Sequence, residues 1–176
     1  GQPLASLEHA RVVVADGAEQ ADQVLAGLVP LVPGGTSDQV DQPREGVAIV
    51  FQHFGLLPWK SVAENVAFGL QMAGASRQLI KERTDRYTKL VGLENFEAQY
   101  PYQLSGGMQQ RVGLARALAI NPDILLMDEP FASVDAQTRE VLQEELLQLH
   151  DSERRTMLFI THSIDEAIVL GDRIAV

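Results

Sequence analysis

The sequence contains no cysteine, which excludes disulfide bonds and metal sites built from thiolates. A chain without cysteine also fits a reducing compartment. No apolar run reaches membrane-spanning length, and the nearest, residues 24–33, is short and interrupted by Pro30. The N-terminus does not have the pattern of a signal peptide. Because the first residue is Gly1 rather than Met, we expect a processed or excised piece.

Positive charge is scarce, with 14 Lys and Arg residues against 24 Asp and Glu residues and a formal net charge of -10. An acidic surface repels phosphate backbones, so nucleic acid is not expected as the main partner. The remaining composition is ordinary, since 45% of residues are hydrophobic and 22% are charged. A chain of 176 residues with this composition can form one globular domain.

The most informative stretch is residues 104–130, LSGGMQQRVGLARALAINPDILLMDEP. Ser105 stands where a helix cap belongs, and Gly106 and Gly107 allow a backbone or an anion to approach closely. Apolar residues then recur at helical spacing: Met108, Val112, Ala115 and Ala119. The free N–H groups at the start of such a helix favour a phosphate.

A second feature follows directly, the unbroken apolar run at residues 124–127 that ends in Asp128-Glu129-Pro130. Such a run predicts a strand that is buried on both faces and therefore parallel to its neighbours. We expect the carboxylates of Asp128 and Glu129 at the C-terminal edge of the sheet, where open α/β folds bind ligands.

Together these features resemble the signature and Walker B motifs of ATP-binding cassette (ABC) transporter ATPases. Residues 104–109 resemble LSGGQ, with Met108 where Gln is common. The resemblance implies an α/β fold: a three-layer core like that of P-loop NTPases, with a mainly parallel sheet and an inserted helical subdomain. We expect one incomplete domain over residues 1–176, with a core at 1–56 and 121–176 and the helical subdomain, including the signature, at 57–120.

The N-terminal region departs from this family. A strand at residues 11–15, a turn at Asp16-Gly17 and a helix at residues 18–28 match its P-loop flanks, but the motif G-x-x-x-x-G-K-[ST] is missing. If Gly17 is the first glycine, the next positions hold Asp22, Gln23 and Val24, and no lysine precedes Lys60. The phosphate loop is therefore interpreted as lost or replaced. A dinucleotide-binding fold is a weaker reading because G-x-G-x-x-G is absent.

Further segments extend the resemblance. Gln52 follows the expected strand at residues 47–51 and resembles the family's Q-loop glutamine. Residues 56–70, LLPWKSVAENVAFGL, resemble importer ATPases for nitrate, sulfonates and taurine, and include the capping box Ser61-x-x-Glu64. In that family the helical subdomain receives a coupling helix from a membrane subunit. Phe54 and Trp59 are candidates for that groove, or pack within the subdomain.

The C-terminal third supplies the last motifs. Residues 131–135 resemble the family's D-loop, and Asp135 is also a candidate cap for a helix at residues 136–150. A strand is expected at residues 156–161. His162 follows it directly and resembles the switch histidine that contacts the γ-phosphate, although a histidine in this place is often only structural.

The resemblance implies a mechanism in which two such domains pair head to tail around ATP and Mg²⁺. Asp128 would hold Mg²⁺, Gln52 would reach towards Mg²⁺ and water, Glu129 would act as general base, and His162 would position the γ-phosphate. The residues implied in nucleotide binding are Ser105, Gly106, Gly107, Gln109 and Asp135.

These observations favour the ATP-binding subunit of an importer for a nitrate-, sulfonate- or taurine-like anion, with weak ATP binding and little hydrolysis in this chain alone. Its implied partners are a second ABC ATPase subunit, identical or different, and a transmembrane permease, at the cytoplasmic face of the cell membrane. The alternative is a non-catalytic module that lends its signature to an intact partner. An ABC-type DNA-repair ATPase is disfavoured by the acidic charge.

Overall fold

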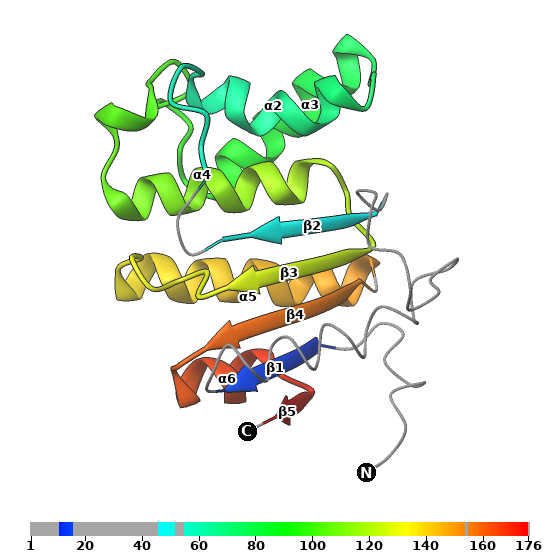
Figure 1. Cartoon of the computed structure of the whole chain (residues 1–176), viewed down its shortest axis with the longest axis vertical. Helices are drawn as coiled ribbons and strands as arrows, with labels where there is room; N and C mark the ends of the chain where they lie inside the picture. Colours follow the sequence, from blue (N-terminus) through cyan, green and yellow to red (C-terminus); the bar gives the residue numbers. More distant parts are fainter. Residues whose placement is uncertain (1–10, 16–45, 52–54, 154, 176) are drawn as a thin grey trace, which may run out of the picture.

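The computed structural model describes residues 11–15, 46–51, 55–153 and 155–175. Its strands form one parallel sheet in the order β2-β3-β4-β1-β5. The strands are β1 (Arg11–Ala15), β2 (Val47–Val50), β3 (Ile124–Asp128), β4 (Thr156–Thr161) and β5 (Arg173–Ala175). All arrows point the same way in Figure 1, so the C-terminal ends of β3 and β4 meet at one edge of the sheet.

The central position of β3 follows from its apolar sequence. It pairs in parallel with β2 on one side and β4 on the other, as the unbroken apolar run predicts. Leu125 and Met127 are fully buried, whereas Ile124 and Leu126 are only half-buried. The prediction of a parallel strand is therefore confirmed, while complete burial of both faces is wrong for the residues that the structure describes.

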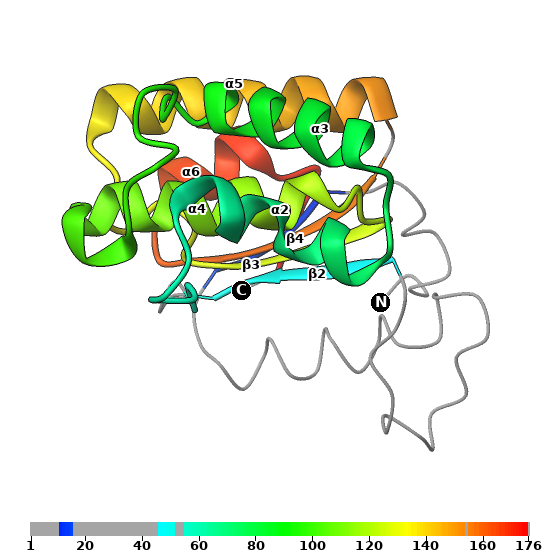
Figure 2. The ribbon, with the colours of Figure 1, turned by 90° about the horizontal axis from the view of Figure 1, so that it is seen from above.

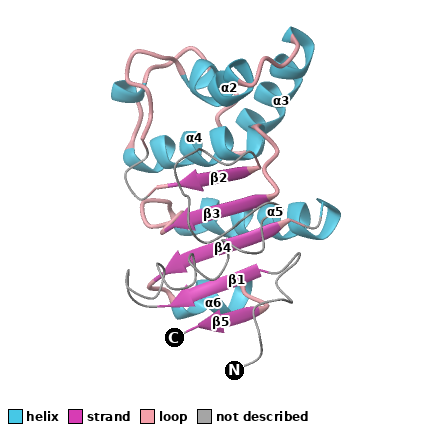
Figure 3. Cartoon of the chain, turned by 45° about the vertical axis from the view of Figure 1, so that its right-hand side comes forward, coloured by secondary structure: helices cyan, strands magenta, loops and turns pink. Residues whose placement is uncertain are grey.

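The helices occupy two places around this sheet. They are α2 (Val62–Met72), α3 (Arg77–Leu90), α4 (Gly106–Ala119), α5 (Ala136–Glu153) and α6 (Ile164–Leu170), with a 3₁₀ turn, η3, at Pro101–Gln103. Helices α5 and α6 lie over the same face of the sheet (Figure 2). Helix α4 packs between β2 and the pair α2–α3, beyond one edge of the sheet (Figure 3).

Local signals account for where these helices begin. Ser61 caps α2: its hydroxyl accepts the Glu64 N–H at 3.3 Å, while the Glu64 carboxylate accepts the Ser61 N–H at 2.8 Å, which confirms the capping box. An apolar stripe then buries α2 against the core, through Val62, Val66 and Leu70. No helix in the described part of the chain is long and apolar enough to cross a membrane.

The α/β class with a parallel sheet is confirmed. Among the described residues the helices over the sheet cover one face, so the third layer stays a prediction. The expected helix at residues 18–28, the phosphate-loop region, Gln52 and Phe54 lie outside the described residues.

Candidate functional site

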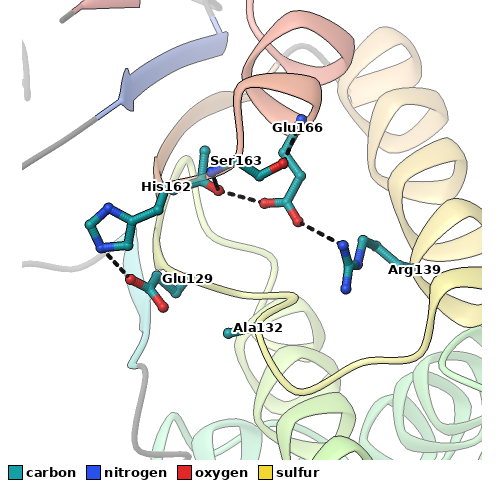
Figure 4. A pocket seen from close by; sticks show the side chains of 7 residues that line it. Glu129, Ala132, Arg139, His162, Ser163 and Glu166 are labelled. Atoms are coloured by element: carbon teal, nitrogen blue, oxygen red, sulfur yellow. Dashed lines mark hydrogen bonds and ion pairs between the residues drawn. The ribbon is translucent and has the colours of Figure 1, made fainter.

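The ends of β3 and β4 bring the two main candidate catalytic residues together. Nε2 of His162 lies 2.7 Å from Oε1 of Glu129 (Figure 4). Because Asp128 pairs with Ile160 in the parallel register, the residues that follow both strands emerge side by side. The side chain of Glu129 is 19% exposed and that of His162 is 65% exposed, so the pair stands at the surface with the carboxylate on its inner side.

Glu129 holds an unusual backbone conformation, with φ at 45°, in the left-handed region that non-glycine residues rarely adopt. Its N–H donates to the Ile160 carbonyl at 2.9 Å, and its own carbonyl accepts the Ala132 N–H at 3.2 Å. These bonds turn the chain sharply after β3. Strain of this kind persists where the surrounding structure determines it, and it is frequent at functional sites.

A buried hydrogen-bonded network holds the two residues that precede and follow His162 in the chain. The Thr161 hydroxyl donates to Oε2 of Glu166 at 2.6 Å and accepts the Ser163 N–H at 3.1 Å. Arg139 reaches the other oxygen of Glu166, at 3.7 Å. Thr161 and Ser163 flank His162, so this network fixes the backbone on both sides of the imidazole (Figure 4).

These groups line an open pocket of about 210 Å³, which also includes Ala132. Sequence reasoning singled out Glu129 and His162 but missed Thr161, Arg139 and Glu166. One signal was present: Glu166 lies on the apolar side of α6 with Ala167 and Leu170, a pattern that indicates a buried carboxylate needing a partner.

A second open pocket, of about 430 Å³, lies at the start of α4. The structure brings Ser105, Gly106, Gly107 and Asp135 together there, along with Arg111. The Ser105 hydroxyl caps α4 by accepting the Met108 N–H at 3.3 Å, which confirms the predicted cap. A helix start with a nearby guanidinium favours an anion.

Asp135 and Gly107 define the other wall of this pocket. The Asp135 carboxylate accepts the Thr138 N–H at 3.0 Å and caps α5, and this hydrogen bond lowers the pKa of the Asp135 carboxyl below its usual value. A Cβ atom on Gly107 would lie 2.5 Å from the backbone oxygen of Ser133. The start of α4 therefore touches the 129–135 loop closely enough to require glycine.

The two glutamines that follow Met108 have different surroundings. Gln109 donates through Nε2 to the carbonyls of Pro101 and Leu104, at 3.0 and 3.2 Å, so its amide contacts the segment before the helix. Its role in nucleotide binding stays a prediction. Gln110, which sequence reasoning did not single out, is 2% exposed and contacts the 129–135 loop.

The side chains at this site can be compared with those that the expected Mg²⁺ and ATP require. Among the described residues no three His, Asp or Glu side chains cluster as a protein-only metal site. Mg²⁺ usually takes one or two carboxylates together with waters and substrate phosphates. The half-buried Asp128 at the end of β3 fits that role, while Gln52 and the phosphate-loop region lie outside the described residues.

A parallel sheet with carboxylates at its C-terminal edge, flanked by a glycine-led helix start, defines an α/β cassette of the P-loop NTPase class. A family model described as "ABC transporter" matches residues 11–132. The chain belongs to the ABC transporter family. The match spans the segment without a recognisable P-loop lysine, so the departure there does not remove the chain from the family.

Individual relatives support the same family membership. The chain is 52% identical, over 78% of its own length, to an uncharacterized ABC transporter ATP-binding protein of Methanocaldococcus jannaschii. It is 52% identical, over 86% of its length, to the taurine import ATP-binding protein TauB of Rhizobium johnstonii. It spans 52% and 59% of these two relatives, little more than half of their length. It is also 53% identical to the glycine betaine transport ATP-binding protein OpuAA of Bacillus subtilis. That match covers 74% of this chain and 31% of the relative.

Solved structures show the same architecture. The dimeric structure of MJ0796, a bacterial ABC transporter cassette, superposes with a TM-score of 0.81 at 30% identity, covering 95% of this chain and 80% of that one. A second structure of that cassette, with the same score, is a post-hydrolysis state bound to ADP and Pi.

Proposed function

We propose that this chain is the ATP-binding part of an ABC importer for a nitrate-, sulfonate- or taurine-like anion. The taurine import relative and the importer-like segment at residues 56–70 support this assignment. The observation that carries the ATPase part is the Glu129–His162 pair at the C-terminal edge of the sheet.

The proposed chemistry is hydrolysis of the terminal phosphate bond of ATP. Glu129 accepts a proton from the attacking water, and His162 holds the Glu129 carboxylate in place and faces solvent where the γ-phosphate would lie. Asp128 would hold Mg²⁺, which neutralises phosphate charge when bound. Because no lysine precedes Lys60, the chain's own phosphate site is weak, and we expect little hydrolysis by the chain alone.

A second candidate function is supported by the pocket at the start of α4. Ser105, Gly106, Gly107 and Asp135 line that pocket and leave it open to solvent. In a head-to-tail dimer these groups would clasp ATP that is bound by the partner, which requires no phosphate loop in this chain. Lending the signature to an intact subunit is therefore the alternative proposal.

The proposed location is the cytoplasmic face of the cell membrane, against a permease subunit. The helical part around α2 and α3 supplies the docking face, and the indole of Trp59, 70% exposed, is its candidate anchor. Large exposed apolar side chains of this kind are typical of interaction surfaces.

Phosphate release separates the two proposals. Phosphate release from Mg-ATP is measured twice, first for the chain by itself and then for a mixture. The mixture also contains a taurine-type ATP-binding subunit that keeps its phosphate loop but has its signature serine replaced by arginine. That partner is inactive by itself because its dimer lacks a working signature, so any activity on mixing must use Ser105 of this chain.

If the chain lends its signature, mixing restores phosphate release, Ser105→Arg abolishes it, and Glu129→Gln leaves it unchanged. If the chain hydrolyses ATP in its own site, the chain alone releases phosphate and Glu129→Gln abolishes that release. Binding of a fluorescent ATP analogue is measured in parallel. Both proposals would be overturned if the chain, alone and in the mixture, neither bound the ATP analogue nor released phosphate.

A further inference from the structure

One buried side chain connects the two candidate pockets. Nε2 of Gln110 donates to the Glu129 carbonyl at 2.7 Å, and Oε1 of the same amide accepts the Ser133 N–H at 2.9 Å. Gln110 lies in α4, whose first turn lines the pocket at Ser105–Gly107, and only 2% of it is exposed. A single amide therefore spans the 129–135 loop from its first residue to its middle.

At one end the bridge acts on the residue with the strained backbone. Glu129 has φ at 45°, and its carbonyl receives the Gln110 amide in addition to the Ala132 N–H. The direction of the Glu129 carboxylate depends on this backbone conformation. Gln110 thus helps to hold the carboxylate where it meets His162.

At its other end the Gln110 amide contacts the wall of the open pocket at the start of α4, lined by Ser105, Gly106 and Gly107, which we name the signature pocket. The Ser133 N–H is bound by Gln110, while the Ser133 carbonyl lies against Gly107, where a Cβ would come within 2.5 Å. Ser133, Val134 and Asp135 line the pocket with the start of α4. The start of α4 and the loop that carries Glu129 are therefore in direct contact at Ser133.

We propose that Gln110 is a positioning residue that couples the signature pocket to the Glu129 carboxylate. The inference rests on the proposed function, in which the signature of one chain serves the ATP of its partner while Glu129 serves its own site. Engagement of the signature pocket would then stabilise the paired Glu129–His162 arrangement of the same chain. A glutamine suits this task because one side chain offers both the donor and the acceptor.

Hydrogen exchange of the full chain, read by mass spectrometry at the amides of residues 129–135, tests the bridge without ATP. Gln110→Met keeps the volume and removes both hydrogen bonds. We expect about tenfold faster exchange at Ser133 and its neighbours, because opening of the loop becomes easier. Gln109→Met is the matched control, since it removes two amide bonds from the same helix that do not reach this loop.

Gln110→Glu gives a rescue test. Its carboxylate can accept the Ser133 N–H but cannot donate to the Glu129 carbonyl, whereas its protonated form can do both. Burial raises the pKa of such a carboxyl, so loop protection should recover relative to wild type as the pH falls from about 8 to about 5. A variant that was merely misfolded would not recover.

The coupling itself is tested by adding the signature-blocked partner and Mg-ATP. We expect exchange at residues 129–135 to slow at least about threefold in wild type and to remain unchanged in Gln110→Met. Exchange in Gln110→Met that equals wild type, or that rises equally in all segments, would overturn the bridge. If mixing restores phosphate release but leaves exchange at residues 129–135 unchanged in wild type, the coupling is overturned. If mixing restores no phosphate release, the proposed function fails instead.

Discussion

Nε2 of His162 and Oε1 of Glu129 are 2.7 Å apart, and the two residues directly follow neighbouring parallel strands. The distance is that of a charge-assisted hydrogen bond, so each side chain limits the rotamers of the other. The Glu129 carboxylate therefore has a nitrogen partner within the chain itself. This arrangement leads to the first prediction.

Glu129→Gln and His162→Ala are each expected to lower residual phosphate release about 100-fold. Glu129→Gln removes the general base, and His162→Ala removes the imidazole that orients the Glu129 carboxylate. The double variant should lose little more than either single variant, since the two residues act as a unit. Single-turnover assays with enzyme in excess over ATP measure all three. Independent, multiplicative losses would contradict this interpretation of the pair.

Thr161→Val is expected to lower the free energy of unfolding by about 1–3 kcal/mol, because the buried Glu166 carboxylate loses the hydroxyl bonded at 2.6 Å. Thr161→Ser keeps the hydroxyl and should cost clearly less. Urea unfolding of both variants provides the comparison. Equal losses would mean that the methyl group of Thr161, which Thr161→Ser removes, contributes as much to stability as the hydrogen bond to Glu166, which Thr161→Val removes.

Gly107→Ala is expected to destabilise the fold by about 1–3 kcal/mol, since the added Cβ would meet the Ser133 carbonyl at 2.5 Å. The clash involves a backbone atom, so Ser133→Gly in the same chain should not relieve it. Thermal melts of the single and double variants test this expectation. A fully stable Gly107→Ala chain would show that the contact between α4 and the loop is looser than the structure indicates.

Stability should depend on pH through Asp135. Hydrogen bonding from Thr138 lowers the pKa of the folded Asp135 carboxyl below the unfolded value of about 3.9. A lowered pKa contributes stability that is present above the unfolded pKa and is lost as the pH falls through the folded pKa. Asp135→Asn retains a capping side chain without this titration.

The melting temperature of wild type should therefore exceed that of Asp135→Asn at pH of about 7, and the difference should shrink below a pH of about 4. Asp135→Ser, another cap that does not titrate in this range, should follow the Asn variant. A difference that grew on acidification would contradict the assigned direction of the Asp135 pKa.

Much of the fold could be predicted from the sequence because the signals are local. The observed bounds of β1, Arg11–Ala15, and of β4, Thr156–Thr161, are the predicted ones. Ser61 and Ser105 act within one helical turn of their own position, so their capping roles were readable from neighbouring residues alone. The apolar run before Asp128 likewise predicted a parallel strand.

Strand order was not readable in this way. β1 is first in the chain yet lies between β4 and β5, which come last. Such an order depends on non-local pairing, and local patterns do not encode which parallel strand lies beside which. The site shares this limit: motifs indicated Glu129 and His162 separately, but their contact exists because β3 and β4 are neighbours.

The sequence by itself therefore determined the caps Ser61, Ser105 and Asp135, the acid-ended inner strand and the family, since each depends on residues close together in the chain. The tertiary structure alone decided that Gln110 reaches both Glu129 and Ser133, and that Thr161 and Arg139 meet Glu166. The physical reason is that a buried polar group must find partners within hydrogen-bond distance, and packing decides which distant residues come that close.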